Sequence, residues 1–265
     1  RGCGVTMPAL DARALRARYP RFAVTDDMVG HLEADAGFVR PERCIAAQLA
    51  DLSERAVLAL GETIVEVREA GGGVEVVTDA GRYRARRAVL ATGAWTPGLV
   101  GGAFGELRVL RQVQYWFEVT EPALWRAGPT FLWFHGDGPA DVFYGFPPDG
   151  GASVKVATEQ YQTACDPDRY DREVSADEAA AMFETHVRGR LNGVGPTLNA
   201  AAACLYTFNG APGREGRFMI GPHPGVPGVT VVSACSGHGF KHAAGLGDAL
   251  AAQVLGETPF CDLSP

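Results

Sequence analysis

The sequence has neither a long hydrophobic run nor an excess of positive charge. No apolar stretch approaches the roughly 20 residues that a membrane-spanning helix requires, so no membrane segment is expected. Lys and Arg number 24 against 31 Asp and Glu, which gives a formal net charge of −7 at pH 7. Nucleic acids and anionic membranes repel a negative chain, and we expect neither as a partner.

Cysteine is too scattered to define a metal knuckle or a disulfide framework. The six cysteines occupy positions 3, 44, 165, 204, 235 and 261, and no pair has CxxC spacing. His238 and His242 have i,i+4 spacing, but no third ligand accompanies them and Lys241 between them would repel a cation. A G-x-S-x-G nucleophile elbow is absent as well. The sequence therefore predicts neither a metal site nor Ser/His/Asp catalysis.

The first ten residues, RGCGVTMPAL, lack the apolar core of a signal peptide, so we expect a cytoplasmic protein. The hydrophobic fraction of 46% and the charged fraction of 21% are ordinary for a globular protein. A chain of 265 residues can form one large domain or two closely joined ones.

The first half of the chain reads as short helices followed by β-strands. Asp11 and Pro20 bound a predicted helix, and Pro41 begins an amphipathic one. A β-meander is then predicted from runs at 64–67, 74–78 and 83–86, and a buried apolar strand at 88–91.

The second half reads as antiparallel strands with one helix among them. Residues 109–120 alternate polar and apolar side chains, which is typical of a half-buried antiparallel strand. The Ser175–Glu178 capping box begins a helix predicted to reach residue 190. Shorter strands are predicted at 131–134, 142–146, 153–157, 201–208 and 217–220.

A strand, a glycine loop and a helix follow one another near the C-terminus. Val229–Val232 is a β-branched run, residues 236–239 are SGHG, and residues 240–255 have apolar side chains at helical spacing. The loop aims backbone N–H groups and the positive end of the helix dipole at whatever lies above it. The dipole disfavours Lys241 in the first turn, which indicates a ligand there; an ordinary solvated lysine is the alternative.

Four motifs together resemble one enzyme family. They are ATGAW at 91–95, YGFP at 144–147 followed by Lys155, CLYT at 204–207 and SGHGFK at 236–241. With gaps, nearly the whole chain resembles the monomeric sarcosine oxidase and N-methyltryptophan oxidase family, FAD-dependent amine oxidases of the D-amino-acid oxidase superfamily. The resemblance implies oxidation of a secondary or N-methyl amino acid, with hydride transfer to FAD and reduction of O2 to hydrogen peroxide.

The resemblance also implies which residues contact FAD. In the family, a valine at the place of Val65 contacts the adenine through its backbone, and the ATGAW turn lets the backbone approach the cofactor. The loop before the last helix lies at the pyrimidine end of the flavin, where a positive dipole stabilises the reduced anion. The implied cofactor-binding residues are Val65, Thr92, Gly93, Trp95, Cys204, Gly237, His238, Gly239 and Lys241. The alternative for ATGAW is a glycine turn beside a core tryptophan.

Four residues are implied to be catalytic: Tyr144, Lys155, Glu159 and Lys241. A lysine at the place of Lys155 lies near flavin N5 and promotes the reaction with O2, because a buried cation stabilises superoxide. A lysine at the place of Lys241 helps to bind the substrate carboxylate. The family has a histidine where this chain has Glu159, so we expect a different substrate preference. Without the resemblance, Lys155 would read as an outward-facing strand residue.

The CLYT motif implies a covalent cofactor link. In the family, the cysteine at the place of Cys204 is joined through sulfur to the flavin 8α-methyl group. A lone cysteine among apolar neighbours is otherwise a small buried hydrophobe. The match fades after Thr207, where the chain has the longer loop NGAPGREG in place of an acidic residue. Gln112 also matches a family motif, but no role follows for it.

The dinucleotide fingerprint of the family is not found in the chain. No strand, G-x-G-x-x-G, helix and acidic residue occur at the required spacing. We therefore expect weak or no FAD binding by these 265 residues unless a missing N-terminal segment or a partner chain supplies the diphosphate site. The expected fold class is α/β with mixed α+β character. A partial FAD-binding domain is predicted at 1–107 and 200–265, and an antiparallel-sheet substrate domain at 108–199.

Two other functions stay open. A truncated or split subunit could act as a non-catalytic binding module of the family, and it would show no flavin spectrum under any reconstitution. A flavin dehydrogenase that does not use O2 would reduce its flavin without forming peroxide.

Overall fold

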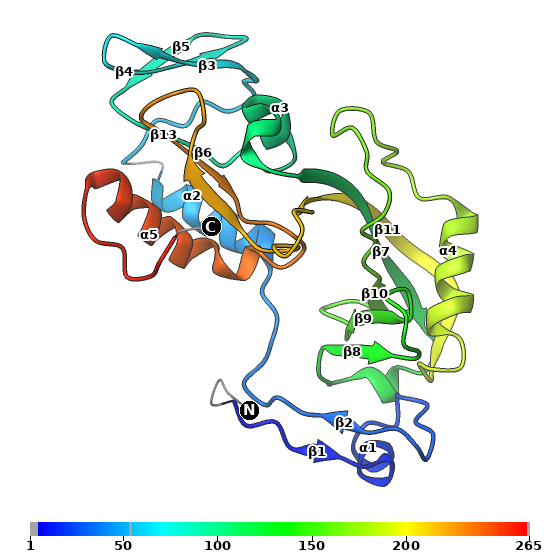
Figure 1. Ribbon diagram of the computed structural model, residues 1–265. Helices are drawn as coiled ribbons and strands as arrows, with labels where there is room; N and C mark the ends of the chain where they lie inside the picture. The colour runs from blue at the N-terminus through cyan, green and yellow to red at the C-terminus, as the bar shows by residue number, and fades with distance from the viewer. Residues whose placement is uncertain (1–4, 53–54, 264–265) are drawn as a thin grey trace. The chain divides into compact units, whose positions relative to one another are not determined.

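The computed structural model describes residues 5–52 and 55–263 (Figure 1). The chain divides into two compact units, and each is assembled from three segments. Unit 1 takes Arg1–Phe38, Gln112–Gln160 and Asp171–Cys204, whereas unit 2 takes Val39–Arg111, Tyr161–Tyr170 and Leu205–Pro265. Within the described ranges, no helix has the length and apolar character needed to cross a membrane.

A five-stranded sheet forms the centre of unit 1, in the order β11-β7-β10-β9-β8. Its strands are β7 (Leu107–Val119), β8 (Phe131–Phe134), β9 (Val142–Phe146), β10 (Ser153–Ala157) and β11 (Val194–Asn209). The pairs β7–β10, β10–β9 and β9–β8 are antiparallel. The three short strands have the predicted bounds. The strand predicted at 201–208 is the end of the longer β11.

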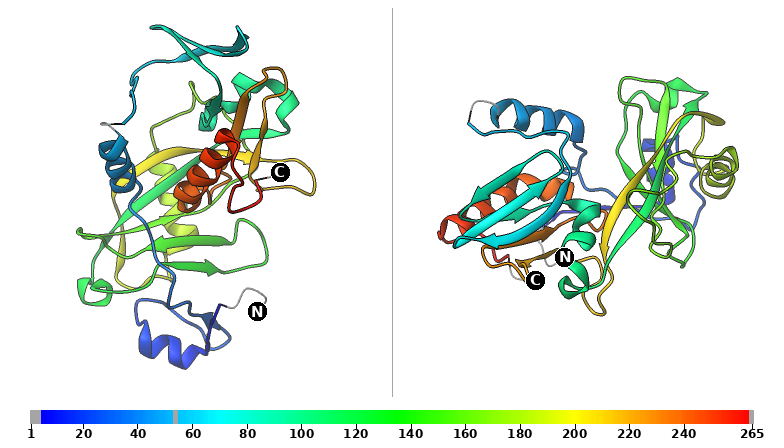
Figure 2. Two further views of the ribbon diagram at one scale, coloured as in Figure 1. Left: turned by 90° about the vertical axis from the view of Figure 1, so that its left-hand side faces the viewer. Right: turned by 90° about the horizontal axis from the view of Figure 1, so that it is seen from above.

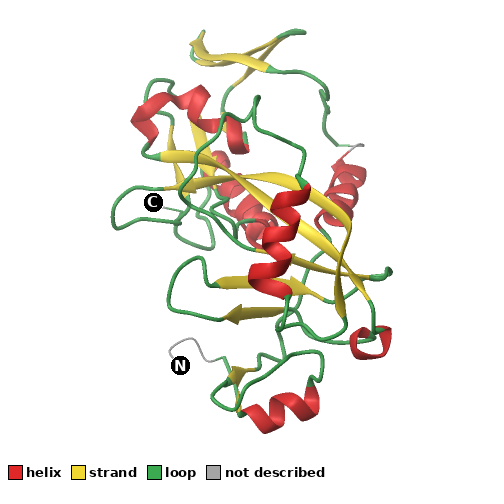
Figure 3. Cartoon of the chain, turned by 90° about the vertical axis from the view of Figure 1, so that its right-hand side faces the viewer, coloured by secondary structure: helices red, strands yellow, loops and turns green. Residues whose placement is uncertain are grey.

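One face of this sheet packs against α4 (Ala176–Met182), which Figure 3 shows lying across the strands. Phe117 of β7 is fully buried there, and its ring meets Phe183 with centroids 5.2 Å apart. The Ser175–Glu178 capping box is confirmed. The α-helix is shorter than predicted, because a π-helical turn follows at Phe183–Val187 and Arg188 leaves the helical conformation.

The N-terminal segment of unit 1 packs against the same core. It contains β1 (Ala9–Leu10), which pairs with β2 (Gly30–His31), and α1 (Ala12–Arg18). As predicted, Asp11 caps the helix, and its carboxylate accepts a hydrogen bond from Ala14 N–H at 2.7 Å. Phe22 anchors the segment, because its ring makes edge contacts with Trp125, Phe131 and Trp133. Trp125 ends the 3-10 turn Pro122–Trp125.

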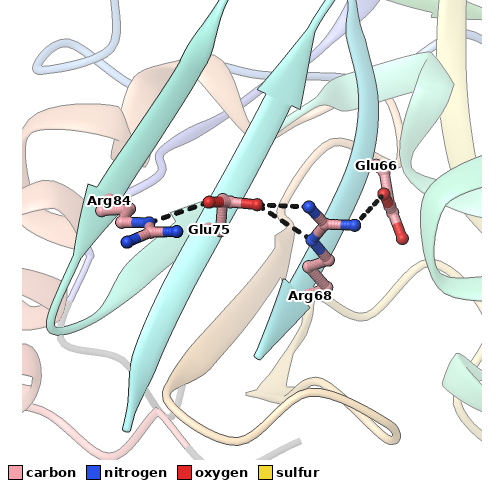
Figure 4. A network of polar contacts seen from close by, with 4 residues as sticks. All are labelled: Glu66, Arg68, Glu75 and Arg84. Atoms are coloured by element: carbon pink, nitrogen blue, oxygen red, sulfur yellow. Dashed lines mark hydrogen bonds and ion pairs between the residues drawn. The ribbon is translucent and has the colours of Figure 1, made fainter. Parts of the chain in front are cut away.

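Unit 2 contains the predicted β-meander: β3 (Ile64–Ala70), β4 (Gly73–Thr78) and β5 (Arg82–Ala85). Figure 4 shows the carboxylate of Glu75 between the guanidinium groups of Arg68 and Arg84, and Glu75 is buried. Glu75 accepts hydrogen bonds from Arg68 at 2.5 and 3.0 Å and from Arg84 at 2.9 Å. These bonds, first that of Arg84 and then those of Arg68, hold the pKa of the Glu75 carboxyl below its usual value.

A second sheet of unit 2 has the order β12-β13-β6. It is made of β12 (Met219–Pro222), β13 (Val229–Ser233) and β6 (Ala88–Leu90), and β13 runs parallel to β6. β6 is one residue shorter than predicted, and it is not buried throughout, since Val89 is 40% exposed. The strand predicted at 217–220 lies two residues later, as β12.

Helix α5 (Ala243–Leu255) packs on this second sheet, beside the strands in Figure 2. Leu250 meets Ile220 and Val232 in a small core. The helix predicted from residue 240 begins as a 3-10 turn at Phe240–His242. The remaining helices of unit 2 are α2 (Pro41–Leu52), α3 (Thr96–Val100) and the 3-10 turns Gly93–Trp95 and Gly101–Phe104.

Candidate active site

The face of the five-stranded sheet that lies opposite the α4 core carries most of the predicted catalytic residues of unit 1. Side chains alternate along a strand, and Val154 and Val156 of β10 are fully buried in the core. Lys155 between them therefore points to the opposite face. In the register, Lys155 stands between Trp116 of β7 and Phe146 of β9. We call this surface the polar face.

The Lys155 ammonium is held between two aromatic rings on the polar face. Its Nζ atom lies 4.9 Å from the centroid of Phe146 and 5.4 Å from that of Trp116. Both distances are within the roughly 6 Å range of cation–π attraction. Sequence reasoning did not single out Trp116. The alternation of Gln114, Tyr115 and Trp116 along β7 is the signal that could have placed it on this face.

Tyr144 lies on the same face as Lys155. It pairs with Ala157 in the register, and its ring meets Phe146 edge-on with centroids 6.0 Å apart. The ring of Phe38 meets Phe146 from another segment of unit 1, also edge-on at 6.0 Å. The rings of Phe38, Tyr144 and Phe146 thus form an aromatic cluster beside the Lys155 ammonium.

Cys204 reaches the polar face from β11. Its sulfur lies 3.9 Å from the amide nitrogen of Gln114, whose strand position pairs with Ala157. The cysteine takes no part in a disulfide and is half-buried. The predicted link from Cys204 to the flavin stays a prediction, and so does the alternative of a small buried hydrophobe.

Glu159 lies just beyond β10 and is exposed. The segment that carries it is fixed by Gln112, a residue that sequence reasoning left without a role. The Gln112 amide donates to Gln160 C=O at 2.6 Å and accepts from Gln160 N–H at 3.0 Å. Because Gln112 is only 3% exposed, these two bonds have no water competing with them from its side.

In unit 2, the glycine loop has the tight geometry that its sequence predicts. Gly237 has a φ of +82° and Ser236 a φ of +45°. A Cβ on Gly239 would lie 1.7 Å from Ala234 C=O, so only glycine closes the loop. His238 stacks on Phe218 at 4.9 Å, and its Nε2 lies 2.9 Å from Gly216 C=O.

Lys241 follows this loop in the 3-10 turn and is exposed. Its predicted partner, the substrate carboxylate, stays a prediction. The composition of the chain also supports a specific role for both lysines. Lys155 and Lys241 are the two lysines of the chain, and all of its other basic residues of the Lys/Arg type are arginine. Lysine and arginine are not interchangeable where a compact ammonium is needed, so their placement at these two positions is informative.

The remaining predicted cofactor contacts also lie in unit 2. Thr92 Oγ1 is 3.0 Å from Thr96 Oγ1, and Gly93 has a φ of +52°. Trp95 is 49% exposed and donates from Nε1 to Asp168 at 2.9 Å, so it is not the core tryptophan of the alternative reading. Val65 is exposed at a bulge in β3. The roles of these residues stay predictions.

Comparisons with known proteins agree with this fold. Residues 2–253 match the family model DAO, described as FAD dependent oxidoreductase. N-methyl-L-tryptophan oxidase of Salmonella heidelberg is 32% identical over 270 residues, covering 97% of this chain and 67% of the relative. Monomeric sarcosine oxidase of Streptomyces avermitilis is 34% identical over 256 residues, covering 93% of this chain and 64% of the relative.

Two solved structures show the same fold. NikD, an unusual amino acid oxidase essential for nikkomycin biosynthesis, has a TM-score of 0.81 at 23% identity and covers 100% of this chain and 70% of its own. Glycine oxidase from Geobacillus kaustophilus has a TM-score of 0.70 at 20% identity, covering 100% and 67%. The chain thus spans about two thirds of the length of these proteins. The predicted mixed α/β fold and the predicted family are confirmed: the chain belongs to the DAO family of FAD-dependent oxidoreductases.

Proposed function

We propose that this chain contributes the catalytic part of an FAD-dependent oxidase that acts on a secondary or N-methyl amino acid and uses O2. The observation that carries the proposal is the placement of its two lysines. One lies on the polar face between Trp116 and Phe146, and the other follows the glycine loop. The two relatives described above are oxidases of N-methyl-L-tryptophan and of sarcosine, which supports an N-methyl amino acid as the substrate class.

The described residues fit the ring end of FAD. Apart from Gly93 and its chain neighbours, no heavy atom of the described residues lies within 4 Å of where a Cβ on Gly93 would stand, so a cofactor can approach the backbone there. The left-handed Gly237 and the tightly closed Gly239 shape the second loop. Thr92 and these three glycines are the residues that would hold the cofactor. When bound, FAD would accept the hydride equivalent of the amine and deliver the electrons to O2.

The chain's own residues supply charge and orientation. Lys155 places a positive charge where a superoxide anion would form, and such a fixed charge is effective because the polar face need not reorganise. Lys241 is proposed to bind the substrate carboxylate. Tyr144 would border the substrate on the polar face, and Glu159 would select a substrate that carries an additional donor or positive charge.

The test is turnover by the full-length protein loaded with FAD. Sarcosine, N-methyl-L-tryptophan and a panel of other secondary amino acids are supplied, and flavin reduction without O2 is measured separately from peroxide formation with O2. The proposal expects both with at least one amine. Flavin reduction without peroxide would instead identify a dehydrogenase, and a protein that takes up no flavin would identify a non-catalytic module.

Lys155→Met should separate the two half-reactions. Removing the cation should slow reoxidation by O2 about 100-fold, in line with the loss of one preorganised oxyanion donor, and leave reduction by the amine within a few-fold. Lys155→Arg is the matched control, because it keeps the charge and changes its shape. Equal loss in both half-reactions would show that Lys155 does not serve O2.

The proposed covalent link has its own readout in the same preparation. Yellow colour that stays with acid-precipitated protein and is lost in Cys204→Ser supports the link, since a thioether survives denaturation. Colour released to the supernatant removes Cys204 from the site and leaves the oxidase proposal intact.

A further inference from the structure

Lys155 sits on a strand whose backbone is fixed on both sides. β10 pairs with β7 on one edge and with β9 on the other, and Val154 and Val156 are fully buried. The Cα and Cβ of Lys155 are therefore held in place by the core. The flexible part is the four-carbon stem, which costs entropy to order unless something holds the ammonium.

The two rings beside Lys155 come from the neighbouring strands. Trp116 stands directly opposite Lys155 on β7, and Phe146 stands directly opposite it on β9. Phe146 is itself braced by edge contacts with Phe38 and Tyr144. An ammonium that has two ring faces within 5.4 Å is attracted to both quadrupoles, and this attraction exists only for the protonated form.

We propose that Trp116 and Phe146 form an aromatic clamp that positions the Lys155 ammonium on the polar face and favours its protonated state. Both are positioning residues that act through Lys155. The significance for O2 chemistry rests on the proposed function, but the clamp itself is a property of this chain and can be measured without cofactor or substrate.

Other charged and titratable groups share the polar face. Glu118 of β7 and Tyr144 of β9 stand opposite Ser153 and Ala157 of β10, respectively. Cys204 lies beside Gln114. Glu159 follows the end of β10. A carboxylate also favours a protonated lysine, so the test must separate ring removal from charge removal.

The chain is well suited to a labelling experiment because it has two lysines. Trace acetylation of the full-length protein with acetic anhydride, followed by peptide mass spectrometry, gives the reactivity of Lys155 and Lys241 across pH. Only a deprotonated amine reacts, so the midpoint of each curve reports the pKa of that amine. Lys241, which is exposed, is labelled in the same experiment and serves as the internal reference.

Trp116→Leu removes one ring while keeping an apolar side chain. We expect the Lys155 curve to move to lower pH, with labelling below the midpoint faster by roughly 3- to 10-fold, and the Lys241 curve to stay unchanged. Phe146→Leu should shift Lys155 in the same direction. Trp116→Phe, which keeps a ring, should restore most of the wild-type curve.

Phe134→Leu is the matched control for Phe146→Leu, because Phe134 lies on edge strand β8 and is 68% exposed. Glu118→Gln measures the carboxylate's share of the Lys155 midpoint. An unchanged Lys155 curve in both Trp116→Leu and Phe146→Leu would overturn the clamp, as would a shift as large in Phe134→Leu. Circular dichroism and a disturbed Lys241 curve would reveal a Trp116→Leu variant that does not fold. In that case the clamp is tested by Phe146→Leu, which should shift the Lys155 curve, and by Trp116→Phe, which should not.

The labelling result and the turnover result are independent. If ring removal shifts the Lys155 labelling curve but the protein oxidises no amine, the clamp is supported and the proposed function is refuted. If the protein oxidises an amine but ring removal leaves the Lys155 curve unshifted, the proposed function is supported and the clamp is refuted.

Discussion

Gln112 shows how one buried side chain can fix a segment that matters for the site. Its amide is an acceptor and a donor at once, and it meets the N–H and the C=O of Gln160. Those backbone groups belong to no strand, because β10 ends at Ala157. Buried backbone groups must find partners, and here a side chain supplies them in place of a β-ladder.

Gln112→Leu should therefore destabilise unit 1. Leucine has a similar size but removes both hydrogen bonds to the Gln160 backbone, which should cost about 1–3 kcal/mol in all. Denaturant unfolding of the full-length protein measures the loss. Gln114→Leu is the control on the same strand, since Gln114 is half-buried and its amide lies 3.9 Å from the Cys204 sulfur. Equal losses in the two variants would contradict the role given to Gln112.

At the scale of elements, the β-meander is held together by charge as well as by its ladder. Glu75 on the central strand β4 bonds Arg68 on β3 and Arg84 on β5, so one carboxylate joins all three strands. Arg68 also pairs with Glu66 at 3.2 Å. The opposite face of the meander supplies Val74 to the core of unit 2. The network therefore joins the three strands on the face that does not supply Val74 to the core.

Glu75→Gln should loosen the meander locally. The amide loses the charge that both guanidinium groups require, and Arg68 and Arg84 are then left facing each other across β4. Amide hydrogen exchange in β4 and β5 should quicken several-fold while exchange in β9 and β10 stays unchanged. Glu69→Gln is the control, because Glu69 is exposed on the neighbouring strand. Exchange that quickens equally in both variants would argue against the network.

At the scale of the whole molecule, each compact unit has its own apolar core in the described residues. The core of unit 1 borders a buried histidine pair: His135 Nε2 lies 3.0 Å from His186 Nδ1. Burial lowers the pKa of both imidazoles, the charge of Arg190 lowers them further, and Asp141 opposes the shift. His186 lies in the π-helical turn.

The histidine pair gives stability a defined pH dependence. Since the folded pKa values lie below the usual 6.5, the unfolded chain binds more protons there, and stability should fall as the pH drops below about 6.5. The depressed pKa of Glu75 adds a second loss at lower pH, below its usual 4.5.

Urea unfolding at pH 7.5 and 5.5 measures the first of these losses. His186→Gln should be less stable at pH 7.5 but less sensitive to pH, whereas His31→Gln, which changes an exposed histidine, should keep the wild-type dependence. A wild-type protein that is equally stable at both pH values would rule out the pair as a source of pH dependence.

Local signals in the sequence were enough for most elements and for the family. Asp11, the Ser175–Glu178 box and the glycine turns act on neighbouring residues, so helix starts and short strands could be predicted from them. The lysines could be singled out because YGFP precedes Lys155 and because Lys241 ends the motif SGHGFK. Local signals did not predict the π-helical turn that shortens α4 or the exposure of Val89 in β6, because both depend on residues distant in the sequence.

The sequence by itself determined the family and named the residues proposed for its chemistry: two lysines, a cysteine and the glycine loops. Tertiary structure alone decided which side chains surround them. Trp116, Phe146 and Lys155 come from three strands, and Gln112 meets Gln160 across 48 positions of the chain. Such contacts depend on strand order and register, which long-range packing of the core selects and which no local pattern encodes.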